Sequence, residues 1–232
     1  MTERELFAVR RALIQAFLRE NGYDGILLSR VDNYAMATGG KRNYVGAGSD
    51  MGANGLFIDR DGAAAFVGNN IEAPRQAEEE LAALGCDIKS FLWFEGNAAD
   101  LVRREFPGEL VSDDGSLGPN VHGALAPLRA LLTEAELHKY RQLGALAAEA
   151  MEAVLAAVRP GMREADIAAQ LVAEGARRRC RVPVALVAAD DRIARFRHPL
   201  PTEAPLWRGG LRERRVERYV MVVAGFVREG LV

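Results

Sequence analysis

The 232-residue sequence is poor in cysteine, in long apolar runs and in excess charge of either sign. Cys86 and Cys180 are far apart and lack a CxxC spacing, which argues against a disulfide framework or a thiolate metal cluster and favours a reducing cytosol. No apolar run reaches the roughly eighteen residues of a membrane helix, and the charged N-terminus lacks a signal-peptide core. The formal net charge of −2 argues against nucleic-acid binding through bulk charge.

The first half of the chain alternates helix and strand patterns. Thr2 and Glu5 have capping-box spacing before an apolar stripe, which predicts a helix that ends at Asn21-Gly22. Residues 25–31 form a short apolar run typical of a buried strand. Because a helix and a buried strand follow each other directly, the pattern predicts an α/β layer.

The middle of the first half contains a glycine-rich stretch and a hairpin signal. Residues 46–55 lack the GKS/T ending of a phosphate loop, so we interpret them as a flexible turn. Asp61-Gly62 lies between two apolar runs and predicts a β-hairpin. Further elements are predicted at residues 71–84 (helix), 86–94 (strand), 98–106 (helix) and 109–112 (strand). Residues 1–127 are therefore expected to form one mixed α/β domain.

A linker at residues 118–127 separates this domain from the second half. It contains His122, which we interpret as a solvated loop histidine rather than a metal ligand, because no nearby residue lies at ligand spacing. Thr133 and Glu136 form a second capping box and begin a long alanine-rich helix that ends at residues 159–161. A helix at residues 162–179 and strands at residues 184–188 and 219–226 are predicted to follow.

One compact polar cluster follows the strand at residues 184–188. Its members are Asp190, Asp191, Arg192, Arg195, Arg197 and His198. One interpretation is a site for chemistry, and the other is a polar turn whose carboxylates pair with Arg192 or Arg195. Neighbouring residues on an extended strand point to opposite faces, so Asp190 and Asp191 are poorly placed to share one metal ion.

Several stretches resemble the creatinase, prolidase and aminopeptidase P family of "pita-bread" metallopeptidases. The resemblance rests on the helix entry at residues 133–137, the pro-gly-x-x-glu joint ending at Glu164, and the H-x-x-P motif at His198. Asn33-Tyr34 with Thr38-Gly39 also resembles a motif of the family's N-terminal domain. The resemblance implies a creatinase-like α/β domain at residues 1–127 and an incomplete α+β pita-bread domain at residues 128–232.

The family's chemistry uses two metal ions, Mn²⁺, Zn²⁺ or Co²⁺, held by two Asp, one His and two Glu. If Gly225 matches the family's glycine, Val223 stands at the position of the first metal-binding Asp. The positions of the remaining ligands would follow the last residue of this sequence. The resemblance therefore implies a site without metal ligands and without a cofactor, with divalent Mn or Zn as the alternative.

The expected function is that of a cytoplasmic, non-catalytic prolidase-like homodimer that binds a peptide or a small molecule. Its predicted ligand-binding residues are His198, Asp190, Asp191, Arg192 and Arg197. The alternative is a hydrolase of the Xaa-Pro peptidase type in which His198 is catalytic. A third hypothesis is a shortened reading frame without activity. Residues 207–218 form a basic insertion, interpreted as a solvated loop or, alternatively, as an anion or partner site.

Overall fold

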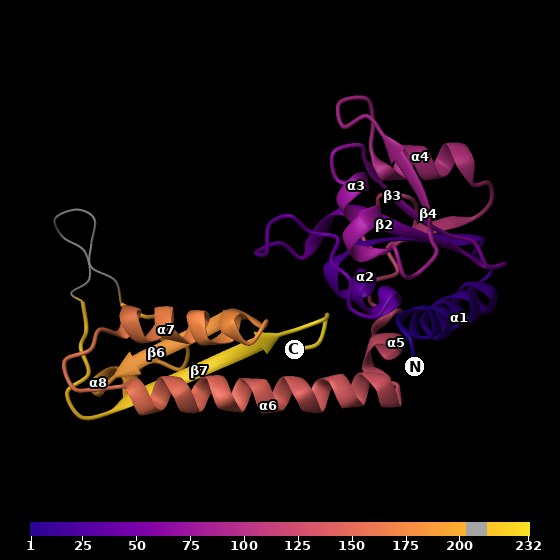
Figure 1. The fold of residues 1–232 in the computed structure, drawn as a ribbon. Coiled ribbons are helices and arrows are strands. Elements are labelled where there is room, and N and C mark those ends of the chain that lie inside the picture. The colour runs from indigo at the N-terminus through magenta and orange to yellow at the C-terminus, as the bar shows by residue number, and fades with distance from the viewer. Residues whose placement is uncertain (203–212) are drawn as a thin grey trace. The chain divides into compact units, whose positions relative to one another are not determined.

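The computed structural model describes residues 1–202 and 213–232, and the chain divides into two compact units, Met1–Leu137 and His138–Val232. Figure 1 shows both units as ribbons. Among the described residues, no helix combines the length and the apolar character needed to cross a membrane.

Unit 1 is built on a five-stranded sheet with the strand order β4-β3-β2-β1-β5. The strands are β1 (Gly25–Arg30), β2 (Met51–Asp59), β3 (Ala64–Asn69), β4 (Asp87–Phe91) and β5 (Leu110–Ser112). Strands β1, β2 and β3 pair antiparallel, whereas β5 runs parallel to β1 and β4 runs parallel to β3. This mixed sheet with flanking helices confirms the predicted fold class of the N-terminal half.

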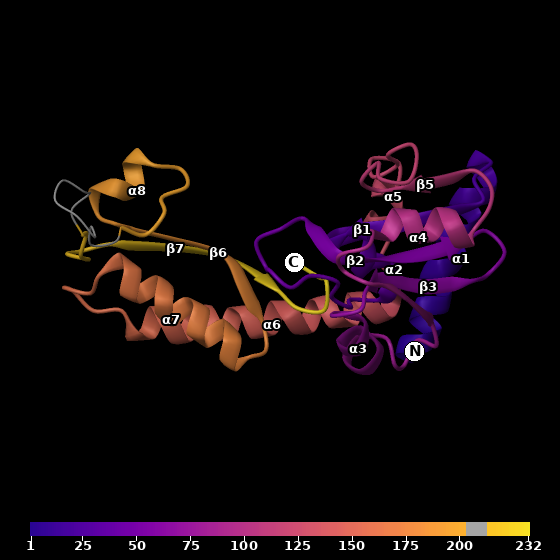
Figure 2. The ribbon, with the colours of Figure 1, turned by 90° about the horizontal axis from the view of Figure 1, so that it is seen from above.

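Helices cover both faces of this sheet. Their bounds are α1 (Glu3–Asn21), α2 (Val31–Thr38), α3 (Ala73–Arg75), a π-helical turn η1 (Gln76–Glu80), α4 (Ala98–Glu105) and α5 (Ala126–Ala130). Successive residues of β1 belong to two different cores, because Ile26 packs with Ile14 of α1 and Leu27 packs with Val102 of α4. Figure 2 shows the strands of unit 1 together with α1 and α4 from a second direction.

Several local predictions for unit 1 are confirmed and others are wrong. Thr2 and Glu5 form the predicted capping box of α1, and Asp61-Gly62 lies in the turn of the β2–β3 hairpin. The glycine-rich stretch is only partly a turn, because residues 51–55 belong to β2. The helix predicted at residues 71–84 is reduced to α3 and η1, and α2 was not predicted from any sequence pattern.

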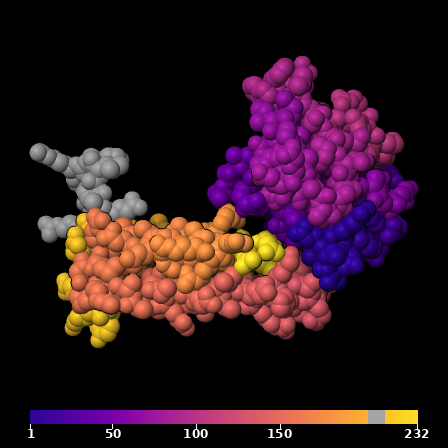
Figure 3. Space-filling view, in the orientation of Figure 1, coloured from indigo at the N-terminus to yellow at the C-terminus, as the bar shows by residue number. Residues whose placement is uncertain are grey.

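Unit 2 consists of helices packed on a two-stranded sheet. Helix α6 (Glu134–Ala157) begins in the last residues of unit 1, and α7 (Glu164–Arg177), β6 (Arg181–Ala189), α8 (Asp191–Arg195) and β7 (Val220–Val227) follow. Strands β6 and β7 pair antiparallel, with Leu186 opposite Val223. Their core joins Val187 and Phe226 to Ile167 and Leu171 of α7. In Figure 3 the side chains of α6 and α7 form a continuous surface.

Candidate functional site

Asp190, at the end of β6, serves as an acceptor for the backbone that leads into β7. Its carboxylate accepts hydrogen bonds from the backbone N–H groups of Tyr219 (2.9 Å), Glu217 (2.8 Å) and Arg218 (2.9 Å). These bonds lower the pKa of Asp190, with the Tyr219 amide as the largest cause. The backbone of Asp190 has φ 49° and ψ −115°, which lies outside the left-handed helical region and is a conformation that glycine adopts more readily than other residues. Asp190 therefore holds the end of β6 next to residues 217–219, which lead into β7.

Asp191 and Arg192 point to different partners at the start of α8. Asp191 is exposed, and its carboxylate lies 3.4 Å from Arg195 and 4.0 Å from Arg214. Arg192 is buried, and its guanidinium pairs with Glu164 and donates a 2.9 Å bond to the carbonyl oxygen of Leu200. Two neighbouring residues of the predicted cluster thus face solvent and core respectively.

Glu164, the first residue of α7, is the centre of the buried polar network in unit 2. Its side chain is fully buried and pairs with the Arg192 guanidinium. It also accepts bonds from the Ala189 amide (2.7 Å) and from the amide and hydroxyl of Thr202 (2.9 Å each). A carboxylate with this many donors is stable without water. The sequence marked Glu164 only as part of a family joint, and its burial was not predicted.

His198 and Arg197 lie at the surface beyond α8. Both residues are exposed, whereas Pro199 next to them is buried. Within residues 1–202 and 213–232, no hydrogen bond or ion pair involves the His198 ring. The structure thus spreads the predicted ligand-binding residues over a backbone clamp, a buried ion pair and an exposed turn. Their role in binding stays a prediction.

The position that the resemblance assigns to the first metal-binding Asp lies on β7. Val223 is 43% exposed and lies opposite Leu186 of β6. An aliphatic side chain offers no donor atom to a metal ion, and the carboxylates of Asp190 and Glu164 in the same unit already accept bonds from N–H donors. The described residues therefore do not fit the two-metal centre of the family. No group of three or more His, Cys, Asp or Glu among them is placed to hold a metal ion.

The basic stretch at residues 207–218 is described only from residue 213, and its earlier part lies outside the described residues. Val216 exchanges backbone hydrogen bonds with Gly161 and Met162. Arg215 donates a 2.9 Å bond to the carbonyl oxygen of Gly161, and Glu213 lies 3.2 Å from Arg163. The described end of the stretch is thus bound to the start of α7. Its interpretation as an anion or partner site stays untested.

A second polar network in unit 1 contains His122, which was predicted to be a solvated loop residue. The Nδ1 atom of His122 lies 3.1 Å from the side-chain nitrogen of Asn33, which also donates a 2.9 Å bond to Asp113. Asn33 Oδ1 accepts a bond from Arg129. The histidine therefore has a partner, and it is only partly exposed. The sequence missed this contact because 89 residues separate His122 from Asn33.

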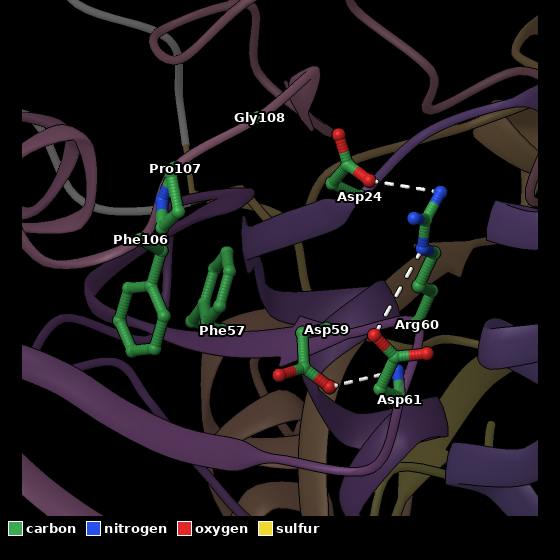
Figure 4. Close-up of a pocket in the computed structure, with 8 residues that line it drawn as sticks. All are labelled: Asp24, Phe57, Asp59, Arg60, Asp61, Phe106, Pro107 and Gly108. Carbon is green, nitrogen blue, oxygen red and sulfur yellow. Dashed lines mark hydrogen bonds and ion pairs between the residues drawn. The ribbon is translucent and has the colours of Figure 1, made fainter.

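One open hollow in unit 1 lies at the end of the sheet that carries the β2–β3 turn (Figure 4). Its volume is about 340 Å³, and its lining residues are Asp24, Phe57, Asp59, Arg60, Asp61, Phe106, Pro107 and Gly108. Asp24 pairs with Arg60 at 2.9 Å, and Asp59 Oδ1 accepts three backbone N–H bonds in the turn. Phe57 stacks on Phe106 with 4.1 Å between ring centroids. These polar groups therefore stabilise the turn, and none of the predicted site residues lines the hollow.

Comparisons with known proteins identify solved structures that have a similar fold. No family model and no curated protein matches the sequence. Among solved structures, a dipeptidase PepE from Mycobacterium ulcerans is similar over 97% of this chain and 61% of its own, with 18% identity and a TM-score of 0.67. An Xaa-Pro dipeptidase from Bacillus anthracis is similar over 95% of this chain and 60% of its own, with 17% identity and a TM-score of 0.62.

A prolidase from Pyrococcus furiosus is also similar, over 91% of this chain and 60% of its own, with 16% identity and a TM-score of 0.60. The chain therefore has the fold of the prolidases and Xaa-Pro dipeptidases, which confirms at the level of fold the family resemblance of its sequence. It spans about 60% of the length of these structures.

Proposed function

We propose that this chain is a prolidase-fold binding protein that forms homodimers and lacks metallopeptidase activity of its own. The observation that carries the proposal is that the carboxylates around α8 already have hydrogen-bond donors. The Glu164 carboxylate binds Arg192, Ala189 and Thr202, and the Asp190 carboxylate accepts bonds from three backbone amides. Redirecting either carboxylate to a metal would leave these donors without their acceptor. Val223 at the position of the first metal-binding Asp supports the same proposal.

The proposed ligand is a peptide or a small molecule with a carboxylate, and the proposed compartment is the cytoplasm. Arg197 and His198 supply exposed donors on one turn, and Arg195 lies close to them in sequence. Arg192 holds the end of this turn through its bond to the carbonyl oxygen of Leu200, and Asp191 lies beside Arg195 at its start. Asp190 joins the same region to residues 217–219. Because a guanidinium and an imidazole both donate to carboxylates, this chemistry favours an anionic end group.

The alternative function is hydrolysis of a small Xaa-Pro peptide or amide through His198. The exposed imidazole, which has no partner among the described residues, is the observation that favours it. An exposed histidine can transfer a proton to a substrate that binds beside it.

The first experiment is elemental analysis of the purified protein together with an Xaa-Pro dipeptide assay in added Mn²⁺. We expect less than stoichiometric metal and no cleavage above background. The matched variants are His198→Ala and, as control, His138→Ala, an exposed histidine on α6. Cleavage that His198→Ala abolishes and His138→Ala preserves would reject the proposal in favour of the hydrolase. About two metal ions per chain would also reject it.

A further inference from the structure

Asn33, a buried residue of α2, is the centre of the polar network that contains His122. Its side-chain nitrogen donates to Asp113 (2.9 Å) and lies 3.1 Å from the Nδ1 atom of His122, while its Oδ1 atom accepts a bond from Arg129 (2.5 Å). Asp113, which follows β5, also accepts bonds from the backbone N–H groups of residues 29 and 30. Because Asp113 accepts and the Arg129 guanidinium only donates, these two partners fix which end of the Asn33 amide carries the hydrogen atoms.

This orientation decides where the His122 ring carries its proton. Asn33 has two side-chain N–H groups, and one is directed at Asp113 and the other at Nδ1 of His122. The Nδ1 atom therefore acts as an acceptor, which requires a neutral imidazole with its proton on Nε2. The contact between the two side chains is thus a hydrogen bond only while His122 is uncharged.

The charged groups beside the ring offer a second partner. Asp32 of α2 has a carboxylate oxygen 3.9 Å from Nδ1 of His122, and the Arg129 side chain of α5 lies 3.5 Å from the same oxygen. Arg30, at the end of β1, lies 3.6 Å from Asp32 and 3.5 Å from Asp50. A charged imidazole that leaves Asn33 is therefore within reach of Asp32, where it competes with two arginines.

The chain segment that carries His122 is attached to unit 1 by few other contacts. The Val121 amide donates a 3.0 Å bond to the carbonyl oxygen of Ser112, and the Leu125 amide donates to the carbonyl oxygen of Val121 (3.2 Å). The His122 side chain is 32% exposed, so a proton from water reaches the ring without unfolding of the segment. A change at this ring is expected to alter how firmly residues 120–125 are held.

We infer that His122 is a pH-sensitive latch between residues 120–125 and α2. The neutral ring accepts the Asn33 bond. A proton bound at Nδ1, in the range between about pH 8 and pH 5 where imidazoles titrate, places two N–H donors against each other and the bond is lost. The charged ring then turns toward Asp32, and the segment is held less tightly. The inference goes beyond the proposed function and does not rest on it, because all these residues belong to unit 1.

Nitrogen-15 NMR of the full-length labelled chain tests the ring itself. At about pH 8 we expect His122 to have a bare Nδ1 atom and a protonated Nε2 atom, and at about pH 5 a proton on both nitrogens together with a shift of the Asn33 side-chain amide signal. Comparison with His122→Asn assigns the His122 signals. A proton on Nδ1 at about pH 8, or an Asn33 amide signal that does not respond to pH, would overturn the inference.

Hydrogen exchange at the Val121 and Leu125 amides, corrected for the pH dependence of the intrinsic rate, measures the latch. Between about pH 8 and pH 5 we expect protection in wild type to fall about ten-fold, the equivalent of one hydrogen bond. His122→Asn, whose amide oxygen accepts without titrating, is expected to change less than about two-fold. His138→Asn, on α6, is the matched control and is expected to keep the fall of wild type.

The same variant separates His122 from the other titrating group of the network. Burial raises the pKa of the Asp113 carboxyl, and His122→Asn keeps this carboxyl. A fall in protection that is equal in wild type and in His122→Asn would therefore assign the pH dependence to Asp113 and overturn the inference, as would a wild type whose protection does not fall. Circular dichroism establishes that both variants are folded.

Discussion

The two units of the chain each bury one arginine against one glutamate at the start of a helix. In unit 1, Arg10 of α1 donates to both oxygens of Glu136 and also to the carbonyl oxygens of Leu128 and Leu131. In unit 2, Arg192 pairs with Glu164. The comparison shows that a buried arginine–glutamate pair can be stabilised by different sets of further hydrogen bonds.

The surroundings of the two glutamates differ in how many donors come from distant segments. Glu136 also accepts bonds from the amide and hydroxyl of Thr133, its capping-box partner in the same turn. The donors to Glu164 come from β6, α8 and Thr202, which are distant in sequence. Burial opposes ionisation of Glu136, but the bonds from Arg10 and Thr133 outweigh it and lower the pKa of this carboxyl.

The largest expected effect follows from Glu164→Ala. This change leaves the buried Arg192 guanidinium without its counter-charge and removes the acceptor of three further hydrogen bonds. We expect a loss of about 3–5 kcal/mol in the free energy of unfolding. Denaturant unfolding with hydrogen exchange of β6 measures it, and Glu152→Ala, an exposed glutamate on α6, is the control. An equal response to both substitutions would show that the network does not hold unit 2 together.

A smaller effect is expected from Arg10→Met. Methionine replaces much of the arginine volume, and Glu136 keeps the two bonds from Thr133, so the expected loss is about 2–3 kcal/mol. Denaturant unfolding of the purified variant measures this loss. Arg4→Met, at an exposed position on the same helix, is expected to change little. A loss larger than that of Glu164→Ala would reverse the proposed ranking of the two networks.

The smallest effect is expected from Asp190→Asn, and it depends on pH. The pKa of Asp190 is lowered in the folded chain, so its ionised form stabilises the fold above its ordinary value of 3.8. That stabilisation is lost as the pH falls through the folded pKa. Thermal unfolding should show wild type more stable than Asp190→Asn at about pH 7, with the gap closing toward about pH 2. A stability difference between the two proteins that does not change with pH would contradict the stabilising role of the ionised Asp190 carboxylate. Asp191→Asn is the control.

Some of this fold was predictable because its signals are local. Thr2 with Glu5 and Thr133 with Glu136 form their capping boxes within one turn, and Asp61-Gly62 turns the chain between adjacent strands. Helix α2 was not predictable in this way. Its first turn has no side-chain cap, and most of its residues are buried, so no amphipathic pattern marks it.

The candidate site also has a part that local sequence signals predict and a part that they do not. The sequence by itself located the polar residues 190–198 and the H-x-x-P motif, because they are neighbours in the chain. Only the tertiary structure decided where each side chain points: Asp190 toward residues 217–219, Arg192 toward Glu164, and His198 to the surface. The physical reason is that a buried polar group is satisfied by whichever donors the packed core brings close, and sequence distance places no limit on them.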